Sequence, residues 1–249
     1  MLNITKKLIT ASAFCFSSIF ATAQEGGTVS GSVSFDYNSH FMSSGIDVWS
    51  TGNSADSLFQ PSASLDFNYG DYGFYTGVWF DINDEVDSTI GGDIQEVDVW
   101  VGGYYTAGAF TFDLALQQWY YGGECEGIVD FTVSYDTVLA PYARLRTRIE
   151  GVGDTDTGSV LEVGGGYDIN EILSVPFAVA YAISDDFAGG DDGLAYVTTG
   201  LGFGYPLEFL TGDWDIHGGV SGFYVPDDYA PGNPDETFLT YSVGMGLSF

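Results

Sequence analysis

Basic residues are scarce in this chain of 249 residues. Five Lys and Arg stand against 35 Asp and Glu, which gives a formal net charge of −30. A balance of this sign excludes nucleic-acid binding through a basic surface. The chain is not a disordered acidic segment either, because 16% of its residues are aromatic and such segments contain few aromatic residues. The acidic residues therefore belong to a folded protein.

Cysteine and long apolar runs are also scarce. Residues 1–23 have the pattern of a signal peptide, with a basic start, a mostly apolar stretch and an A-x-A cleavage site at 21–23. The expected mature domain, 24–249, then keeps only Cys125, so it cannot form an internal disulfide. Beyond the signal, no apolar run approaches the roughly 20 residues that a helix needs to span a bilayer. A membrane-spanning domain would have to use strands.

What the sequence does contain is alternation of apolar and polar residues with a period of two, which is typical of strands with one apolar and one polar face. In 109–120, for example, Phe112 and Leu114 share one face and Asp113 lies on the other. The pattern predicts twelve strands, at 28–41, 58–69, 73–83, 94–105, 109–120, 127–136, 141–149, 159–168, 173–184, 194–205, 213–225 and 237–249.

The connections between these strands are mostly long on one side and mostly short on the other. With an even number of strands, this layout predicts an all-β fold, a transmembrane antiparallel up-and-down β-barrel of about 12 strands with both termini in the periplasm. A secreted β-sandwich is the soluble alternative, but its strands are usually shorter than the ~9 to 14 residues predicted here. Aromatic residues near the strand ends, and an aromatic last residue, Phe249, also favour the barrel.

The first half of the chain resembles the TorF-like porins, a family of outer-membrane barrels. The residues that carry this resemblance are Phe35-Asp-Tyr-Asn-Ser-His-Phe-Met-Ser-Ser-Gly45, Gln60-Pro-Ser-Ala-Ser-Leu-Asp-Phe67, Gly73-Phe-Tyr-Thr-Gly-Val-Trp79 and Glu96-Val-Asp-Val-Trp-Val-Gly-Gly-Tyr104. These proteins often carry an Arg before the glycine of the first loop, where this chain has Ser44, so no role of that Arg is carried over. The resemblance implies an outer-membrane location and a porin role.

All fixed positive charges of the expected mature domain lie on one predicted strand, at Arg144, Arg146 and Arg148. Alternation places them on the inner face, since an Arg that faces lipid near the midplane costs about 2–4 kcal/mol. The neighbouring strands place Asp130 and Glu162 on the same face, with Asp130 opposite Arg146 or Arg148. Further inner-face carboxylates are expected at Asp36, Asp66, Asp81, Glu96, Asp98 and Asp113. We take these eleven residues as candidate pore-lining residues.

Two interpretations of this arginine row stay open at this point. The arginines can brace the barrel through salt bridges with Asp130, Glu162 and acids across the lumen. They can also oppose carboxylates on other walls and form a constriction that filters solutes. Twelve strands lie between the filled eight-stranded barrels and the open sixteen-stranded porins, so the lumen is expected to be narrow or plugged.

The predicted outer loops add more acids, among them Asp84, Asp185 and Asp186. A negative potential at the mouth of a channel favours cations, although such loops are also ordinary solvated surface. The pattern Asp154-Thr-Asp156-Thr-Gly158 begins like a calcium loop but lacks the closing glutamate. We expect no metal site and no cofactor.

Catalysis is not expected. Asp215 and His217 share the inner face, but they lie at the periplasmic half of their strand, and no Ser and His meet on the lipid face. The sequence thus predicts a narrow passive diffusion channel for small solutes or ions that prefers cations. The alternative is a non-conducting structural or surface-binding barrel whose acidic loops bind cations. The expected partners are outer-membrane lipids, lipopolysaccharide and small solutes or ions, with no nucleic acid; an oligomer is left open.

Overall fold

The computed structural model describes residues 27–49, 58–152, 157–184 and 187–249. The expected signal peptide lies outside the described residues, as do Asp185, Asp186 and most of the calcium-like pattern at 154–158. Within the described ranges, no helix is long and apolar enough to cross a membrane.

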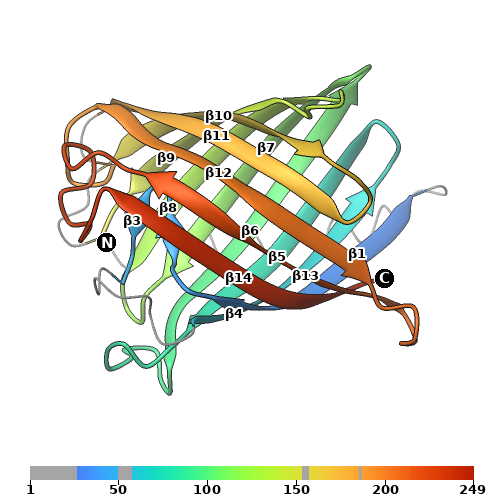
Figure 1. The fold of residues 1–249 in the computed structure, drawn as a ribbon, viewed down its shortest axis with the longest axis horizontal. Coiled ribbons are helices and arrows are strands. Elements are labelled where there is room, and N and C mark those ends of the chain that lie inside the picture. Colours follow the sequence, from blue (N-terminus) through green and yellow to red (C-terminus); the bar gives the residue numbers. More distant parts are fainter. Residues whose placement is uncertain (1–26, 50–57, 153–156, 185–186) are drawn as a thin grey trace, which may run out of the picture.

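Twelve strands form a closed antiparallel barrel in which each strand pairs with its neighbours in sequence and β1 pairs with β14 (Figure 1). This confirms the predicted fold class, and the ends of the strands agree with the predicted ones to within three residues. The barrel strands are β1 Thr28–Asn38, β4 Leu58–Asn68, β5 Tyr72–Ile82, β6 Ile94–Ala107, β7 Phe110–Tyr120, β8 Cys125–Tyr135, β9 Tyr142–Glu150, β10 Gly158–Asp168, β11 Leu173–Ser184, β12 Gly193–Pro206, β13 Asp213–Tyr224 and β14 Thr237–Ser248.

The two ends of the barrel differ in their connections. The loop end, at the left in Figure 1, is where β1 ends and β4 begins, and where the connections β5–β6, β7–β8, β9–β10, β11–β12 and β13–β14 leave and re-enter the barrel. The turn end, at the right, carries 69–71, 108–109, 136–141, 169–172 and 207–212 and the C-terminus. The first loop contains a short hairpin that the alternation did not predict, formed by β2 Met42–Ser43 and β3 Ile46–Asp47.

The outer surface of the barrel is apolar in its middle and aromatic at both ends. Exposed middle residues include Val99, Leu114, Leu116, Phe131, Val163, Val179, Leu201, Val220 and Val243. Exposed tyrosines lie near the turn end at Tyr72, Tyr105, Tyr135, Tyr167 and Tyr205, and near the loop end at Tyr37, Tyr120, Tyr181 and Tyr224. An apolar band between two aromatic girdles is the outer surface of a barrel that spans a bilayer.

The barrel closes on the last residue of the chain. The amide of Phe249 donates to the carbonyl oxygen of Gly31 at 3.0 Å, and the amide of Gly31 donates to the carbonyl oxygen of Phe249 at 2.7 Å. Seven residues of β1, from Ser32 to Asn38, are paired with β14. With this seam closed, the barrel has no free sheet edge, as a membrane interior requires because unpaired backbone groups there are costly.

The inner face accommodates large rings by placing them over glycines of the neighbouring strand. A Cβ added at Gly102 of β6 would lie 2.2 Å from the ring of Tyr75 on β5, and one at Gly77 of β5 would lie 2.2 Å from the ring of Trp100 on β6. Each glycine thus leaves room for an aromatic side chain to lie flat along the wall. This wall, β4 to β9, carries many of the bulky and charged inner residues, among them Tyr75, Trp100 and Arg146.

Candidate functional site: the charged inner face

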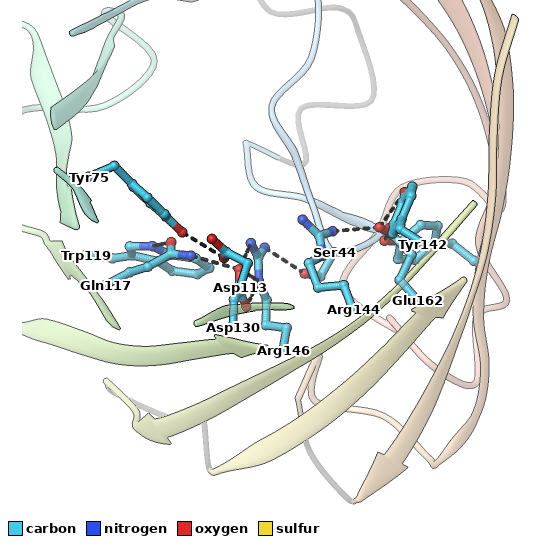
Figure 2. Close-up of polar contacts among 11 residues, drawn as sticks. Ser44, Tyr75, Asp113, Gln117, Trp119, Asp130, Tyr142, Arg144, Arg146 and Glu162 are labelled. Atoms are coloured by element: carbon cyan, nitrogen blue, oxygen red, sulfur yellow. Dashed lines mark hydrogen bonds and ion pairs between the residues drawn. The ribbon is translucent and has the colours of Figure 1, made fainter. Parts of the chain in front are cut away.

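The strands β8, β9 and β10 position the three arginines. In the sheet register, Arg146 lies opposite Asp130 of β8, and Arg144 lies opposite Glu162 of β10. Alternation along β9 turns all three guanidinium groups to the inner face, at steps of about 6.6 Å. Figure 2 shows Arg144 and Arg146 with the polar side chains around them. We call Arg144, Arg146 and Arg148 the arginine ladder.

Arg144 is paired with Glu162. Its Nη2 lies 2.9 Å from Oε1 of Glu162, whose side chain is 8% exposed while that of Arg144 is 30% exposed. The hydroxyl of Tyr142 donates to the same carboxylate oxygen at 2.8 Å, and the hydroxyl of Tyr196 donates to the other oxygen. The carboxylate is thus satisfied by one cation and two phenols, as a largely buried charge requires.

Arg146 makes the most contacts of the ladder. Its Nε donates to Oδ1 of Asp130 at 2.9 Å and its Nη2 to Oδ2 at 2.8 Å, which is the two-pronged geometry typical of strong Arg–carboxylate pairs. The amide of Gln117 donates to the same carboxylate at 2.8 Å, and the guanidinium lies over Trp119, 5.4 Å from the ring centroid. Its Nη1 also donates to Oγ of Ser44 at 3.2 Å, which joins the ladder to the first loop (Figure 2).

Arg148 is the most buried member of the ladder. Its Nε lies 3.0 Å from Oε2 of Glu126, and the two side chains are 4% and 6% exposed. Glu126 was not among the predicted site residues because the predicted strand began one residue later, at 127. The observed strand begins at Cys125, and a register shift between Gly127 and Ile128 accompanies the pairing with β9. The sequence did contain a signal for Glu126, because this carboxylate stands at the end of a strand, two residues before the alternating run begins.

The first loop enters the barrel and contacts the other loops. The turn of the β2–β3 hairpin has Ser44 and Gly45 at positive φ, 50° and 88°. The hydroxyl of Tyr229 donates to the carbonyl oxygen of Ser44 at 2.8 Å. The side chain of Asn233 donates to the carbonyl oxygen of Gly45 at 2.9 Å and accepts from the amide of Asp47 at 2.9 Å. The hairpin turn is therefore held between β9 and the last loop.

A second set of residues fills the loop end with apolar side chains. Phe187, Val225, Tyr229 and Ala230 come from connections between strands, and they pack against wall residues in one buried cluster. The wall residues are Val160, Ala180, Ala182, Ala195, Tyr196 and Phe238. Phe187 also contacts the ladder, since Nη1 of Arg148 donates to its carbonyl oxygen at 2.6 Å. Part of the loop end is thus occupied by the chain itself.

Within the described residues, the other predicted site residues form no ion pair with the arginines, and each has its own hydrogen-bond partners or neighbours. Asp113 accepts from the hydroxyl of Tyr75 at 2.7 Å, and Asp66 lies 3.3 Å from the hydroxyl of Tyr104. Asp81 is fully buried and accepts from Trp49, Gln60 and Asn83 at 2.8, 3.0 and 2.9 Å.

Glu96 and Asp98 lie close to Asp81, and we call these three carboxylates the acidic wall. Glu96 lies directly opposite Asp81 in the register of β5 and β6 and is 3% exposed. Asp98 lies two residues further along β6, opposite Trp119 of β7, and one of its oxygens has no hydrogen-bond partner among the described residues. The carboxylates therefore gather on β5 and β6, close to the loop end. Across the described residues, no group of three or more His, Cys, Asp or Glu has the geometry to hold a metal ion.

Asp36 belongs to a separate cluster with the predicted pair Asp215 and His217. Nδ1 of His217 lies 2.5 Å from Oδ1 of Asp215, and Nε2 lies 2.8 Å from Oδ1 of Asp36. Ser34 Oγ donates to the second oxygen of Asp36 at 2.5 Å. The approach of Asp36 to His217 was not predicted, because it depends on the closing pairing of β1 with β14, which joins the two ends of the chain.

Comparison with solved structures supports the barrel assignment. The KdgM porin in complex with disordered oligogalacturonate matches with a TM-score of 0.51 at 10% identity, over 88% of this chain and 99% of that chain. A structure from work on in-meso crystallization of membrane proteins matches with 0.50 at 9% identity, over 88% and 83%. The NanC porin in a rhombohedral crystal form matches with 0.48 at 11% identity, over 87% and 98%. At these identities, the two matches with TM-scores of 0.51 and 0.50 show a likeness of the barrel fold alone.

The sequence itself matches no protein-family model and no curated protein. The resemblance to TorF-like porins in residues 30–121 therefore stays a prediction. What the structure adds is the arrangement of the inner face, with a paired arginine ladder, an acidic wall and a histidine–carboxylate cluster.

Proposed function

We propose that this protein is a porin of the bacterial outer membrane, a narrow passive channel for small solutes or ions that prefers cations. A closed barrel with an apolar band and two aromatic girdles supports the membrane location, because each barrel strand is paired on both sides and the outer surface is apolar. The loop end then faces outward and the turn end faces the periplasm. The segment 1–23 is its signal peptide, so the mature protein begins at Gln24.

The proposed cation preference rests on one observation: after each arginine of the ladder is paired with a carboxylate, the inner face still carries further carboxylates without an arginine partner. Arg144, Arg146 and Arg148 are each matched by a carboxylate at 2.8–3.0 Å. No fixed cation of the mature barrel is then left to balance the other inner-face acids. These acids are Asp36, Asp66, Asp98 and Asp113, which are partly exposed, together with Asp81 and Glu96, which are buried and therefore contribute least to the potential that a passing ion meets. Excess carboxylate in a narrow low-dielectric lumen concentrates cations and repels anions. The ladder itself acts as a brace of the wall.

Planar-bilayer recording tests this function. The full chain is produced in a Gram-negative host, purified from the outer-membrane fraction and reconstituted under a potassium chloride gradient. We expect discrete current steps and a reversal potential of cation-selective sign. An anion-selective reversal potential would contradict the charge argument. The mass of the purified protein checks in the same preparation whether the chain begins at Gln24.

A second function is favoured by the way the chain fills its own loop end. The hairpin turn at Ser44 contacts Arg146, and the apolar cluster around Phe187 and Tyr229 is buried. A barrel occluded in this way is a non-conducting structural or surface-binding protein. Its acidic loops would bind cations or, through bridging cations, lipopolysaccharide. Silence of a demonstrably folded barrel in the bilayer experiment supports this second function over the first.

A further inference from the structure

The inner face has two unlike walls. Opposite the bulky wall of β4 to β9, the inner residues of β12, β13 and β14 are mostly small. They include Gly200, Gly202, Gly204, Gly219, Ser221, Ser242, Gly244 and Gly246. Small side chains leave space, and two cavities lie against this wall. One has a volume of about 220 Å³ and the other about 380 Å³.

The two cavities share part of their lining, namely Asn38, His40, Ser221 and Thr240. The smaller one extends along β13 to Gly219 and Gly218 and along β14 to Ser242. None of the ladder arginines lines either cavity. We call this space the small-wall path. It runs from beside the first loop toward the turn end and passes the arginine ladder by.

The histidine–carboxylate cluster lies beyond the turn-end side of this path, next to its lining residues, and its three side chains do not themselves line either cavity. His217 directly precedes Gly218 on β13, and Gly244 follows Ser242 by two residues on β14, on the same face. Gly244 lies between the strands of His217 and Asp36 and pairs with both residues in the register. A Cβ at Gly244 would lie 2.0 Å from Oδ1 of Asp36 and 2.7 Å from Nε2 of His217. Only glycine lets the two side chains meet across β14.

Among the ion pairs of the described residues, those of this cluster are the most exposed to solvent. The side chains of His217, Asp36 and Asp215 are 34%, 26% and 39% exposed, whereas both members of the Arg148 pair are under 10% exposed. Charges that water reaches are also charges that a passing ion meets. The paired and buried part of the ladder cannot act in this way.

The contacts of the His217 ring determine how the net charge of the cluster changes when the ring gains or loses a proton. Both ring nitrogens face carboxylate oxygens, at 2.5 and 2.8 Å, and a carboxylate only accepts. Both contacts are hydrogen bonds only when the ring is the imidazolium, and the cluster then carries one net negative charge. Loss of one ring proton leaves two negative charges and one broken hydrogen bond. Histidine is the side chain whose charge ordinarily changes between about pH 5 and 8.

The described residues that flank the His217 ring on the adjoining strands are not ionisable, apart from Asp36 itself. β12 presents Gly204 and Pro206, opposite His217 and Asp215, and β14 presents Gly244 and Gly246. β1 contributes Ser34 beside Asp36, with its Oγ 3.5 Å from Nε2 of His217. On the far side of β1, β4 presents Gln60 and Ser62. The charge of the cluster is therefore set by its three members alone.

We propose that His217, Asp36 and Asp215 form the selectivity site of the small-wall path, and that its preference for cations increases as His217 loses its proton. This inference rests on the proposed channel function and specifies which residues set its selectivity. The arginine ladder, which the sequence pointed to first, braces the wall.

The test is the reversal potential of the reconstituted barrel between pH 5 and 9. For the wild type we expect the ratio of cation to anion permeability to rise about two-fold or more with pH, because the net negative charge of the site doubles. His217→Gln keeps a polar side chain without a titrating charge, so it should show a high ratio that no longer changes with pH.

A pair of glycine variants tests the geometry without altering any charged residue. Gly244→Ala forces Asp36 away from His217, so it should weaken the pH dependence as His217→Gln does. Gly204→Ala is the matched control, because Gly204 flanks His217 on the other side and an added Cβ there meets nothing within 4 Å. These variants also keep the inference testable if His217→Gln fails to fold.

The outcomes separate the inference from the proposed function. A folded wild-type barrel without current steps overturns the channel function and the selectivity site with it. A conducting barrel overturns the inference alone if its reversal potential does not change with pH. The same holds if the pH dependence survives in both His217→Gln and Gly244→Ala, or disappears in Gly204→Ala.

Discussion

Arg148 and Glu126 form the most deeply buried ion pair of the ladder, with Nε 3.0 Å from Oε2 and the side chains 4% and 6% exposed. The guanidinium also lies over the ring of Phe187, 4.4 Å from its centroid. Removing one partner of such a pair leaves an uncompensated charge in a buried place. The arginine ladder is therefore expected to matter most for stability at this position and least at Arg144, which is 30% exposed.

Glu126→Gln should lower the free energy of unfolding by about 3–5 kcal/mol, the usual cost of breaking a buried pair. The double variant Glu126→Gln with Arg148→Met should recover part of that loss, because no buried charge is left unpaired. Arg144→Met, at the exposed end of the ladder, should cost less. Guanidinium unfolding of the barrel in lipid vesicles, followed by tryptophan fluorescence, measures all three. Equal losses for Glu126→Gln and Arg144→Met would contradict the graded burial.

If the arginine ladder braces the wall and does not line the ion path, replacing one of its ion pairs should leave the ion selectivity unchanged. Arg146 and Asp130 neutralise each other at 2.8 Å. Replacing them together, as Arg146→Met with Asp130→Asn, leaves the net charge of the lumen unchanged. We expect the reversal potential to stay at the wild-type value while the barrel becomes less stable. A clear change in selectivity for this neutral pair would mean that ions pass along the ladder.

Much of the fold could be predicted because one physical rule governs all twelve barrel strands. A strand between lipid and a wet lumen must alternate, and Phe112, Asp113 and Leu114 show that alternation in the sequence alone. The same rule placed Arg146 and Asp130 on one face, and the structure pairs them directly. Local periodicity was sufficient to predict this contact between adjacent strands.

What could not be predicted depends on contacts that periodicity does not encode. Glu126 was missed because the predicted strand began at 127, and its approach to Arg148 accompanies a register shift in the pairing of β8 with β9. Asp36 meets His217 only because β1 and β14 close the barrel, and Ser44 reaches Arg146 only because the first loop turns inward. Loops carry no repeating pattern, so their path into a lumen has no signal in a single sequence.

Loosening the first loop should widen the channel. Asn233 makes two hydrogen bonds to the hairpin turn, to the carbonyl oxygen of Gly45 and from the amide of Asp47, each 2.9 Å. Asn233→Ala removes both, at about 0.5–1.5 kcal/mol each. We expect larger or more frequent current steps and passage of larger neutral polymers. Asn170→Ala is the control, since it removes comparable hydrogen bonds at the turn end. Equal effects of both variants would rule out a constricting role of the hairpin.

The apolar outer band predicts the cost of a charge on that face. Leu114 is 50% exposed in the middle of β7, between the two aromatic girdles. Leu114→Arg should lower the free energy of unfolding in lipid vesicles by about 2–4 kcal/mol, the cost of Arg at the bilayer midplane. Leu114→Met keeps the apolar contact and should have little effect. If the arginine variant is as stable as the methionine variant, β7 does not face lipid at this point.

Asp47, in the first loop outside the membrane-spanning strands, makes the hairpin sensitive to pH. Burial raises the pKa of this carboxyl above its ordinary value, although the charge of His40 opposes the rise. A raised folded-state pKa means that the folded loop binds the proton more tightly than the unfolded chain does. The ionised carboxylate therefore destabilises the hairpin, and this destabilisation develops as pH rises from the unfolded value, about 3.9, through the folded one.

Hydrogen exchange of the peptide that covers residues 39–49 can measure this effect, after correction for the intrinsic exchange rate. In the wild type we expect stronger protection near pH 4 than at pH 8. Asp47→Asn keeps the shape without the charge, so its protection should be the same at both pH values and exceed the wild type at pH 8. Asp84→Asn changes an exposed loop acid and should leave the wild-type pattern in place. Weaker protection of Asp47→Asn at pH 8 would show instead that the ionised carboxylate holds the loop, and the sign of the argument would be reversed.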